Sequence, residues 1–344
     1  MKPIVRVRYV NFFKGFDDAL CMSHVFMELA DEYQFVFDGV PDIVLIGCYS
    51  QEPIGETRAI KVGYYTENLA PDLVNCDYFF GCEYAELVGH PRYCKRVFGP
   101  AAIHSFDGCA DPHLALAAKT EFCSFIYSHR VGYRERFFQA LNGYRPVRAP
   151  GKSMNNCSDL AARTEGDWHA AKRSYLQKFK FTIAFENSRR AGYVTEKLFD
   201  AFDADTIPIY WGDPNLETIV NKDAVVWIDG DWEREVLPWL QLPETREPFR
   251  PYLRTPTLTN KFAGRFNSFA QYLRDRWPYS RGFTAIEEIR YLDNDDDAYR
   301  RKLAQPRARR DEILKIRADY LASWRKIISQ SLDRSDAGPH LANT

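Results

Sequence analysis

The stretch 180–215 constrains the fold of this chain more than any other segment. Apolar side chains alternate over 181–185, which predicts a strand. An apolar face at helical spacing over 198–202 predicts a helix, and Thr195 is a residue type that commonly caps a helix start. A second apolar run over 207–211 predicts another strand. A strand, a helix and a further strand in succession form the repeating unit of a parallel α/β sheet.

Polar residues follow the first of these strands, at the edge where a parallel sheet binds its ligands. This edge holds Asn187, Tyr193, Glu196 and Lys197. Lys197 falls in the first helical turn, although the helix dipole disfavours a cation there. Its side chain could extend into solvent, or a bound anion could neutralise it in a phosphate clamp. The residue types alone leave both interpretations open.

The pattern F-E-N-x5-Y-V-T-E-K, followed by I-P-I-Y-W-G, resembles the donor-binding motif of the α-1,3-fucosyltransferases, family 10 of the glycosyltransferases. The resemblance implies a GT-B-like α/β fold, with two Rossmann-like domains facing each other across a cleft. It implies that Lys197 contacts the diphosphate of GDP-β-L-fucose and that Glu196 accepts hydrogen bonds from the ribose. Asn187 and Tyr193 would orient the donor. Glu186 could contact the donor or have a structural role.

A second candidate cation, Arg134, begins a predicted helix after a strand predicted over 121–128. The chain has no glycine-rich phosphate loop, so fixed cations are the available means of holding a diphosphate. The resemblance places a phosphate-binding arginine at Arg134, although Arg136 is a near neighbour that could take the role. Gly151 and Lys152 are expected to lie under the donor.

Glu67 follows a strand predicted over 59–65, at the start of a loop on the ligand-facing edge. The residues alone favour a loop carboxylate that caps the next turn or pairs with an arginine. The segment Y-T-E-N-L-A-P-D-L-V-N-C-D-Y, however, resembles the N-terminal motif of the family, in which the glutamate is the proposed general base. The resemblance therefore implies that Glu67 removes the proton of the acceptor hydroxyl.

Length and composition allow more than one hydrophobic core. The chain has 344 residues, of which 45% are hydrophobic and 27% charged. Turn-forming residues over 99–114 predict a linker. We expect an N-terminal acceptor-binding domain over 1–118 and a C-terminal GDP-fucose-binding domain over 119–310. The segment 311–344 is expected to form a basic amphipathic helix and tail, which could lie on a membrane or pack against the protein.

No metal or other cofactor is expected besides the GDP-fucose donor. Cys76, Cys82, His90 and Cys94 match no standard zinc spacing. The acidic run 293–297 follows a helical pattern rather than a strand, which favours a solvated turn over a divalent-ion site. The net charge of −1 gives no general attraction to nucleic acid. The sequence predicts neither a signal peptide nor a membrane span, which favours a cytoplasmic location with at most peripheral contact to the inner membrane.

Together these inferences predict an inverting glycosyltransferase that moves L-fucose from GDP-β-L-fucose to the 3-hydroxyl of N-acetylglucosamine in a Lewis-type oligosaccharide. One alternative is the same fold acting on another sugar nucleotide, or forming another linkage such as α-1,4 or a core chitobiose product. A protein that binds nucleotide sugars or glycans without catalysis is a further alternative.

Overall fold

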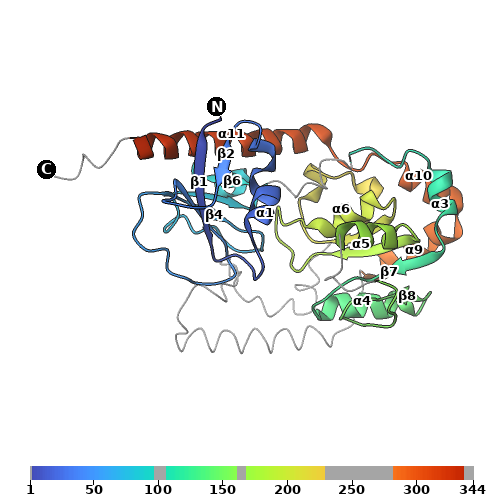
Figure 1. Cartoon of the computed structure of the whole chain (residues 1–344). Helices are drawn as coiled ribbons and strands as arrows, with labels where there is room; N and C mark the ends of the chain where they lie inside the picture. Colours follow the sequence, from blue (N-terminus) through green and yellow to red (C-terminus); the bar gives the residue numbers. More distant parts are fainter. Residues whose placement is uncertain (1, 97–105, 161–167, 229–281, 337–344) are drawn as a thin grey trace, which may run out of the picture. The chain divides into compact units, whose positions relative to one another are not determined.

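The computed structural model describes residues 2–96, 106–160, 168–228 and 282–336. The chain divides into two compact units, each with a parallel sheet of its own (Figure 1). Unit 1 consists of Met1–Val97, Thr245–Thr255 and Ile313–Thr344, and unit 2 of Phe98–Glu244 and Pro256–Glu312. The chain passes from unit 1 into unit 2 after residue 97 and returns to unit 1 after residue 312. The sequence predicts these two boundaries after residues 118 and 310.

Six parallel strands form the sheet of unit 1, in the spatial order β2-β1-β3-β4-β5-β6. They are β1 (Ile4–Val10), β2 (Gln34–Val36), β3 (Ile43–Ile46), β4 (Ile60–Tyr64), β5 (Tyr78–Gly81) and β6 (Tyr93–Lys95). Their register aligns apolar residues, since Val7 pairs with Ile43 and Ile43 pairs with Ile60. Because the strands are parallel, the loops that follow them emerge at one edge of the sheet.

Both faces of this sheet are covered. One face packs against α1 (Asp18–Cys21), the π-helical turn η1 (Met22–Phe26), the 3-10 turn η2 (Met27–Leu29) and α11 (Arg310–Asp336). The loops after β3 and β4, together with α2 (Ala85–Val88), supply apolar side chains to the other face. A parallel sheet buried on both sides accounts for the continuous apolar run in β3.

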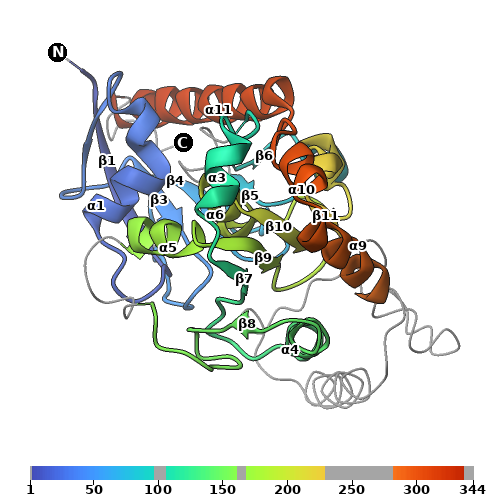
Figure 2. The ribbon, with the colours of Figure 1, turned by 90° about the vertical axis from the view of Figure 1, so that its right-hand side faces the viewer.

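The C-terminal helix α11 contributes to the core of unit 1. Trp324 is fully buried and stacks on Phe80, with ring centroids 4.5 Å apart. It also meets Phe26 edge-on, at 5.0 Å. Figures 1 and 2 both show α11 lying along this sheet. The helix predicted over the tail is therefore a structural part of unit 1.

Some of the basic residues of α11 hold the helix in place. Arg325 pairs with Glu32 at 2.7 Å, and Arg317 donates a hydrogen bond to Glu28. Of the two placements considered for this helix, packing against the protein is the one observed. Among the described residues, no helix is both long enough and apolar enough to cross a membrane.

Five parallel strands form the sheet of unit 2, in the order β11-β10-β9-β7-β8. They are β7 (Glu121–Ser124), β8 (Val147–Arg148), β9 (Phe179–Phe185), β10 (Ile207–Trp211) and β11 (Val226–Trp227). The strand–helix–strand unit predicted over 180–215 is confirmed as β9, α6 (Glu196–Asp203) and β10. Apolar residues are in register here as well, with Ile183 beside Ile209 and Phe185 beside Trp211.

Helices also cover both faces of the second sheet. The alternate apolar residues of β9 and β10 pack in one core with α4 (Gly132–Asn142), α9 (Gly282–Asn294) and α10 (Asp296–Leu303). On the opposite side, α6 packs on β9 and β10, and α5 (Trp168–Leu176) packs on α6. The helix α3 (Pro112–Ala117) lies beside α10 (Figure 2). Two 3-10 turns, η4 (Leu216–Thr218) and η5 (Lys222–Ala224), precede β11.

Two predictions about connecting segments need correction. The linker predicted over 99–114 contains the start of α3, and its residues 99–105 lie outside the described part of the chain. The acidic run 293–297 is not wholly a solvated turn, because Asp293 is buried and pairs with Arg145 at 2.9 Å and with Lys180 at 3.3 Å. These partners lie 148 and 113 residues away along the chain, so local sequence patterns could not predict them.

Candidate active site

A buried carboxylate organises the carboxyl end of β9. Glu186 is fully buried, and its Oε1 accepts a hydrogen bond from the backbone N–H of Thr195 at 2.7 Å. Its Oε2 accepts a second hydrogen bond from the Thr195 hydroxyl, also at 2.7 Å. Thr195 is the N-cap residue of α6, as the sequence predicts, but its side chain makes no capping bond because the hydroxyl is directed at Glu186. Of the two roles considered for Glu186, this geometry favours the structural one.

Lys197 belongs to the same hydrogen-bonded group. Its Nζ donates to Thr195 Oγ1 at 2.9 Å and lies 3.7 Å from Glu186 Oε2 and 3.4 Å from Glu196 Oε1. Burial raises the pKa of Glu186, and the Lys197 ammonium opposes that rise. Two carboxylates therefore offset the unfavourable helix dipole at Lys197, whose side chain keeps 17% of its surface exposed.

Glu196 opens α6 with a half-exposed carboxylate. Partial desolvation raises its pKa, but the ammonium groups of Lys197 and Lys172 outweigh that effect and lower the pKa to about 2. Lys172 is a buried residue of α5 that pairs with Asp200 at 2.6 Å, and nothing in its local sequence marks it as part of the site. Glu196 consequently remains an anion, and thus a hydrogen-bond acceptor, at neutral pH.

Arg134 is a buried cation near the start of α4. Only 1% of it is exposed, and its guanidinium lies over the ring of Tyr127 at 4.3 Å. Its Nη2 donates a hydrogen bond to Asn187 Oδ1. Lys197 pairs with Glu186, the preceding residue, so the two cations contact consecutive residues after β9. The Nε of Arg134 has no hydrogen-bond partner, and within the described ranges no carboxylate pairs with this side chain. An unpaired buried cation is costly, so the position suits a bound anion.

The other expected donor-site residues differ in how far they are exposed. Tyr193 is 2% exposed and lies within the loop that leads to α6. Gly151 packs so closely on the backbone of Tyr127 that a Cβ would lie 2.4 Å from the Tyr127 carbonyl oxygen. Lys152 is exposed, and Arg136, the alternative phosphate-binding cation, is partly exposed.

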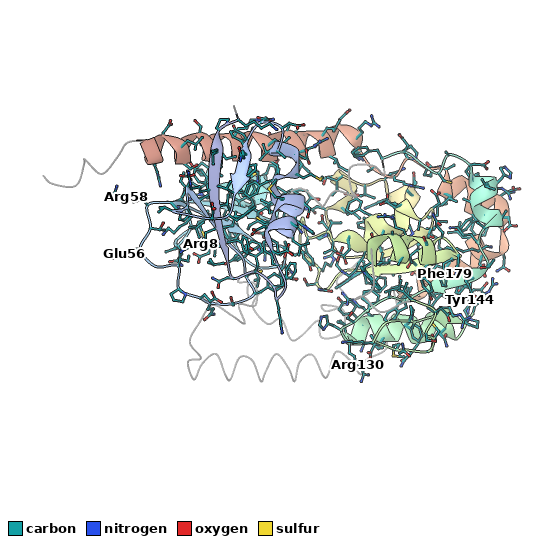
Figure 3. All side chains as sticks on the ribbon, viewed as in Figure 1. Arg8, Glu56, Arg58, Arg130, Tyr144 and Phe179 are labelled. Carbon is teal, nitrogen blue, oxygen red and sulfur yellow. The ribbon has the colours of Figure 1, made fainter. Side chains whose placement is uncertain are left out.

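Glu135, a residue not predicted from the sequence, fixes the loop that contains Gly151. Its Oε1 accepts a hydrogen bond from the buried Ser153 hydroxyl at 3.0 Å. The same carboxylate accepts two hydrogen bonds, at 2.8 and 3.0 Å, from Arg130, which lies just before α4 (Figure 3). These bonds lower the pKa of Glu135, with the Arg130 hydrogen bonds as the main cause.

In unit 1, Glu67 lies in the loop after β4, as the sequence predicts. Its Oε1 accepts a hydrogen bond from the Tyr49 hydroxyl at 2.9 Å. That hydroxyl also lies 2.9 Å from Thr66 Oγ1. Partial burial raises the pKa of Tyr49, and the Glu67 carboxylate adds to the rise, so the phenol remains a hydrogen-bond donor. Tyr49 follows β3, and local spacing gives no sign that it reaches a residue 18 positions later.

Two protein-family models match this chain. The model for the alpha-(1,3)-fucosyltransferase FucT N-terminal domain matches residues 7–96. The model for glycosyltransferase family 10 (fucosyltransferase), C-terminal part, matches residues 116–238. The chain belongs to glycosyltransferase family 10. The resemblance inferred from the sequence motifs is thereby confirmed, and the two matched segments contain Glu67 and the cluster around Glu186 respectively.

Individual fucosyltransferases resemble the chain over shorter segments. The alpha-(1,3)-fucosyltransferase FucT of Helicobacter pylori is 38% identical over 137 residues, which are 40% of this chain and 26% of that protein. The human 4-galactosyl-N-acetylglucosaminide 3-alpha-L-fucosyltransferase FUT6 is 30% identical over 125 residues, or 35% of this chain and 32% of that protein. The matched segments thus span about a quarter to a third of these relatives.

A solved fucosyltransferase structure shares the fold. A crystal structure of an alpha1,3-fucosyltransferase with GDP-fucose matches with a TM-score of 0.60 at 21% identity, covering 95% of this chain and 91% of that one. The match agrees with the two Rossmann-like units described above and confirms the predicted GT-B-like α/β class.

Close packing explains the glycine in the sequence I-P-I-Y-W-G. A Cβ on Gly212 would lie 2.5 Å from Glu186 Cγ and 2.5 Å from the Tyr210 hydroxyl oxygen. Both distances are shorter than the contacts that a Cβ atom makes in proteins. Glycine is therefore the residue that fits where the end of β10 approaches Glu186. The glycine therefore allows Glu186 to hold the start of α6.

We predict that Gly212→Ala destabilises the protein by about 1–3 kcal/mol, because the added methyl group overpacks the site around Glu186. Urea unfolding measures the difference. Gly143→Ala is the matched control, since Gly143 ends α4 with φ −69° and its nearest contact to an added Cβ is 3.3 Å. Equal stability of the two variants would contradict the packing role of Gly212.

Proposed function

We propose that this protein is an inverting fucosyltransferase that transfers L-fucose from GDP-β-L-fucose to the 3-hydroxyl of N-acetylglucosamine in an oligosaccharide. The observation that carries the proposal is the environment of Arg134. This guanidinium is buried, touches aromatic rings and an amide, and retains an unsatisfied Nε. A diphosphate would supply the missing negative charge and acceptor oxygens.

The leaving group determines what the donor site must supply. When the bond between fucose C1 and the β-phosphate oxygen breaks, GDP takes the electron pair and gains negative charge. Arg134 and the exposed side of Lys197 would stabilise that charge, and Glu196 would accept hydrogen bonds from the ribose hydroxyls. Asn187, held by Arg134, and Tyr193 would orient the donor. Stabilisation of this kind is typically worth about 3–4 kcal/mol for each well-placed group.

The acceptor hydroxyl must lose its proton as its oxygen bonds to fucose C1. We assign that proton to Glu67, since its carboxylate lies at the ligand-facing edge of unit 1. Attack on the side opposite the leaving GDP converts the β-linked donor into an α-linked product. The Tyr49 hydroxyl donates to Oε1 of Glu67, which fixes the carboxylate that would accept the proton.

The choice of acceptor and linkage rests on family membership. The H. pylori relative is named for α-1,3 transfer, and the human relative for transfer to an N-acetylglucosaminide. Transfer to another hydroxyl, to a chitobiose core or from another sugar nucleotide are the alternatives. Product linkage analysis after offering GDP-fucose with N-acetyllactosamine, its β1,3 isomer and chitobiose distinguishes them.

We predict that Arg134→Ala weakens GDP binding about 10- to 100-fold, because charge-assisted hydrogen bonds to the phosphates are lost. Isothermal titration calorimetry with GDP measures the change. Arg134→Lys, which keeps the charge but loses the planar fork, should show an intermediate loss. Arg290→Ala, at an exposed arginine of α9, is the matched control. Affinity within twofold of the wild type in a folded Arg134→Ala protein would exclude the phosphate role.

Glu67→Gln should lower turnover at least about 100-fold while leaving donor affinity nearly unchanged, because the amide cannot accept the proton. Steady-state assays of GDP release measure kcat, and calorimetry measures donor binding. Glu86→Gln, on α2 of the same unit, serves as the control. A non-catalytic binding protein would show no difference between the two variants.

We propose further that transfer requires no divalent ion, since Arg134 and Lys197 would supply the positive charge that a metal ion supplies to a diphosphate at other sites. Activity should persist in EDTA. Complete loss in EDTA that manganese restores would contradict this part of the proposal. We also propose that the protein acts in the cytoplasm and that exposed basic residues of α11 make weak contact with a membrane surface.

A further inference from the structure

Two exposed aromatic rings lie side by side at the ligand-facing edge of unit 1. Phe13 follows β1 and is 40% exposed, and Tyr49 follows the adjacent strand β3 and is 38% exposed. Their centroids are 5.7 Å apart, in an edge-to-face arrangement. Single exposed apolar side chains need no explanation, whereas two exposed rings in contact form a small aromatic surface on which a ligand can pack.

This pair is directly connected to the proposed general base. The Tyr49 hydroxyl donates a hydrogen bond to Glu67 Oε1 at 2.9 Å, so the Tyr49 ring lies next to this carboxylate. The loops after β1, β3 and β4 thus contribute Phe13, Tyr49 and Glu67 in turn, in the order in which these strands are paired. An acceptor whose hydroxyl reaches Glu67 would therefore meet the rings with the rest of its sugar.

The backbone holds the two rings in a fixed relation. Asn11 adopts a left-handed conformation with φ 63°, and its carbonyl accepts a hydrogen bond from the N–H of Tyr49 at 2.8 Å. The Asn11 side-chain oxygen accepts hydrogen bonds from Ser50 Oγ at 2.8 Å and from the N–H of Glu52 at 2.7 Å. Gly47 permits this contact between the loops, since a Cβ there would lie 2.5 Å from the Asn11 oxygen.

Phe13 belongs to a larger cluster of aromatic rings. Phe16 meets Phe13 edge-on at 5.4 Å and stacks on Phe12 at 4.1 Å. Tyr9, in β1, meets Phe16 at 5.1 Å. A surface that is fixed before the ligand arrives loses little conformational entropy on binding.

We infer that Phe13 and Tyr49 form the subsite for the acceptor sugar. This inference rests on the proposed function and adds the means by which the acceptor is held. A pyranose presents one face of C–H groups, which packs on aromatic rings, and a rim of hydroxyls, which requires polar partners. The paired rings match the first requirement. The Tyr49 hydroxyl and the Glu67 carboxylate, which lie next to the rings, match the second requirement.

Binding of N-acetyllactosamine tests this subsite without requiring turnover. Saturation-transfer NMR titrations should give a dissociation constant at least about tenfold higher for Phe13→Ala than for the wild type, because the ring contact is lost. Phe13→Tyr keeps a ring and should bind nearly as the wild type does. Leu87→Ala removes an exposed apolar side chain of α2, 60% exposed, and should leave binding unchanged. Equal acceptor affinity in Phe13→Ala and Leu87→Ala would overturn the inference.

Kinetics of the same variants separate this inference from the proposed function. Phe13→Ala should raise the KM for the acceptor about tenfold and change the KM for GDP-fucose less than twofold. Tyr49→Phe keeps the ring and loses the hydroxyl, so it should lower kcat with little change in acceptor KM. A wild-type protein that binds N-acetyllactosamine through Phe13 but never consumes GDP-fucose would refute the transferase activity and leave the sugar subsite supported.

Discussion

The proposed donor site in unit 2 depends on one buried carboxylate, Glu186. Removing a carboxylate from water is costly unless several hydrogen bonds and a cation compensate for it. Here Thr195 donates twice, Lys197 lies 3.7 Å away and Gly212 leaves the necessary space. These contacts fix the end of β9 to the start of α6. This connection positions Asn187, which contacts Arg134. It also positions Glu196 and Lys197, the first two residues of α6. The proposed contacts to the nucleotide therefore depend on a residue that is itself completely buried.

The two units apply the same principle to different tasks. Each places its polar residues in loops at the carboxyl ends of parallel strands, where a rigid sheet positions them. Unit 2 presents cations, which suit a diphosphate. Unit 1 presents a carboxylate with two exposed rings, which suits the proton and the C–H face of an acceptor sugar. In the proposed reaction, residues of unit 2 stabilise the charge that develops on the leaving group. A residue of unit 1 accepts the proton of the acceptor hydroxyl.

Sequence patterns predict the strands and the polar residues at their ends, because alternation and chain order determine both. They do not predict which side chains meet across neighbouring strands. Tyr49 reaches Glu67 from the adjacent strand, and Lys172 affects Glu196 from another helix, so neither has a local signal. The side-chain partners of Thr195 and Asp293 could not be predicted for the same reason. Thr195 has a cap residue's identity but a stronger partner in Glu186, and Asp293 lies in an acidic run but is neutralised by distant basic residues. The motif glycine Gly212 becomes interpretable only once Glu186 is seen beside it.

The most direct test of the account is a crystal structure of the protein with GDP bound. We expect a phosphate oxygen within about 2.7–3.2 Å of a guanidinium nitrogen of Arg134, including the Nε that now has no partner, with the ribose hydroxyls at Glu196. A GDP molecule bound with its phosphates away from Arg134 and from the start of α6 would contradict the central claim.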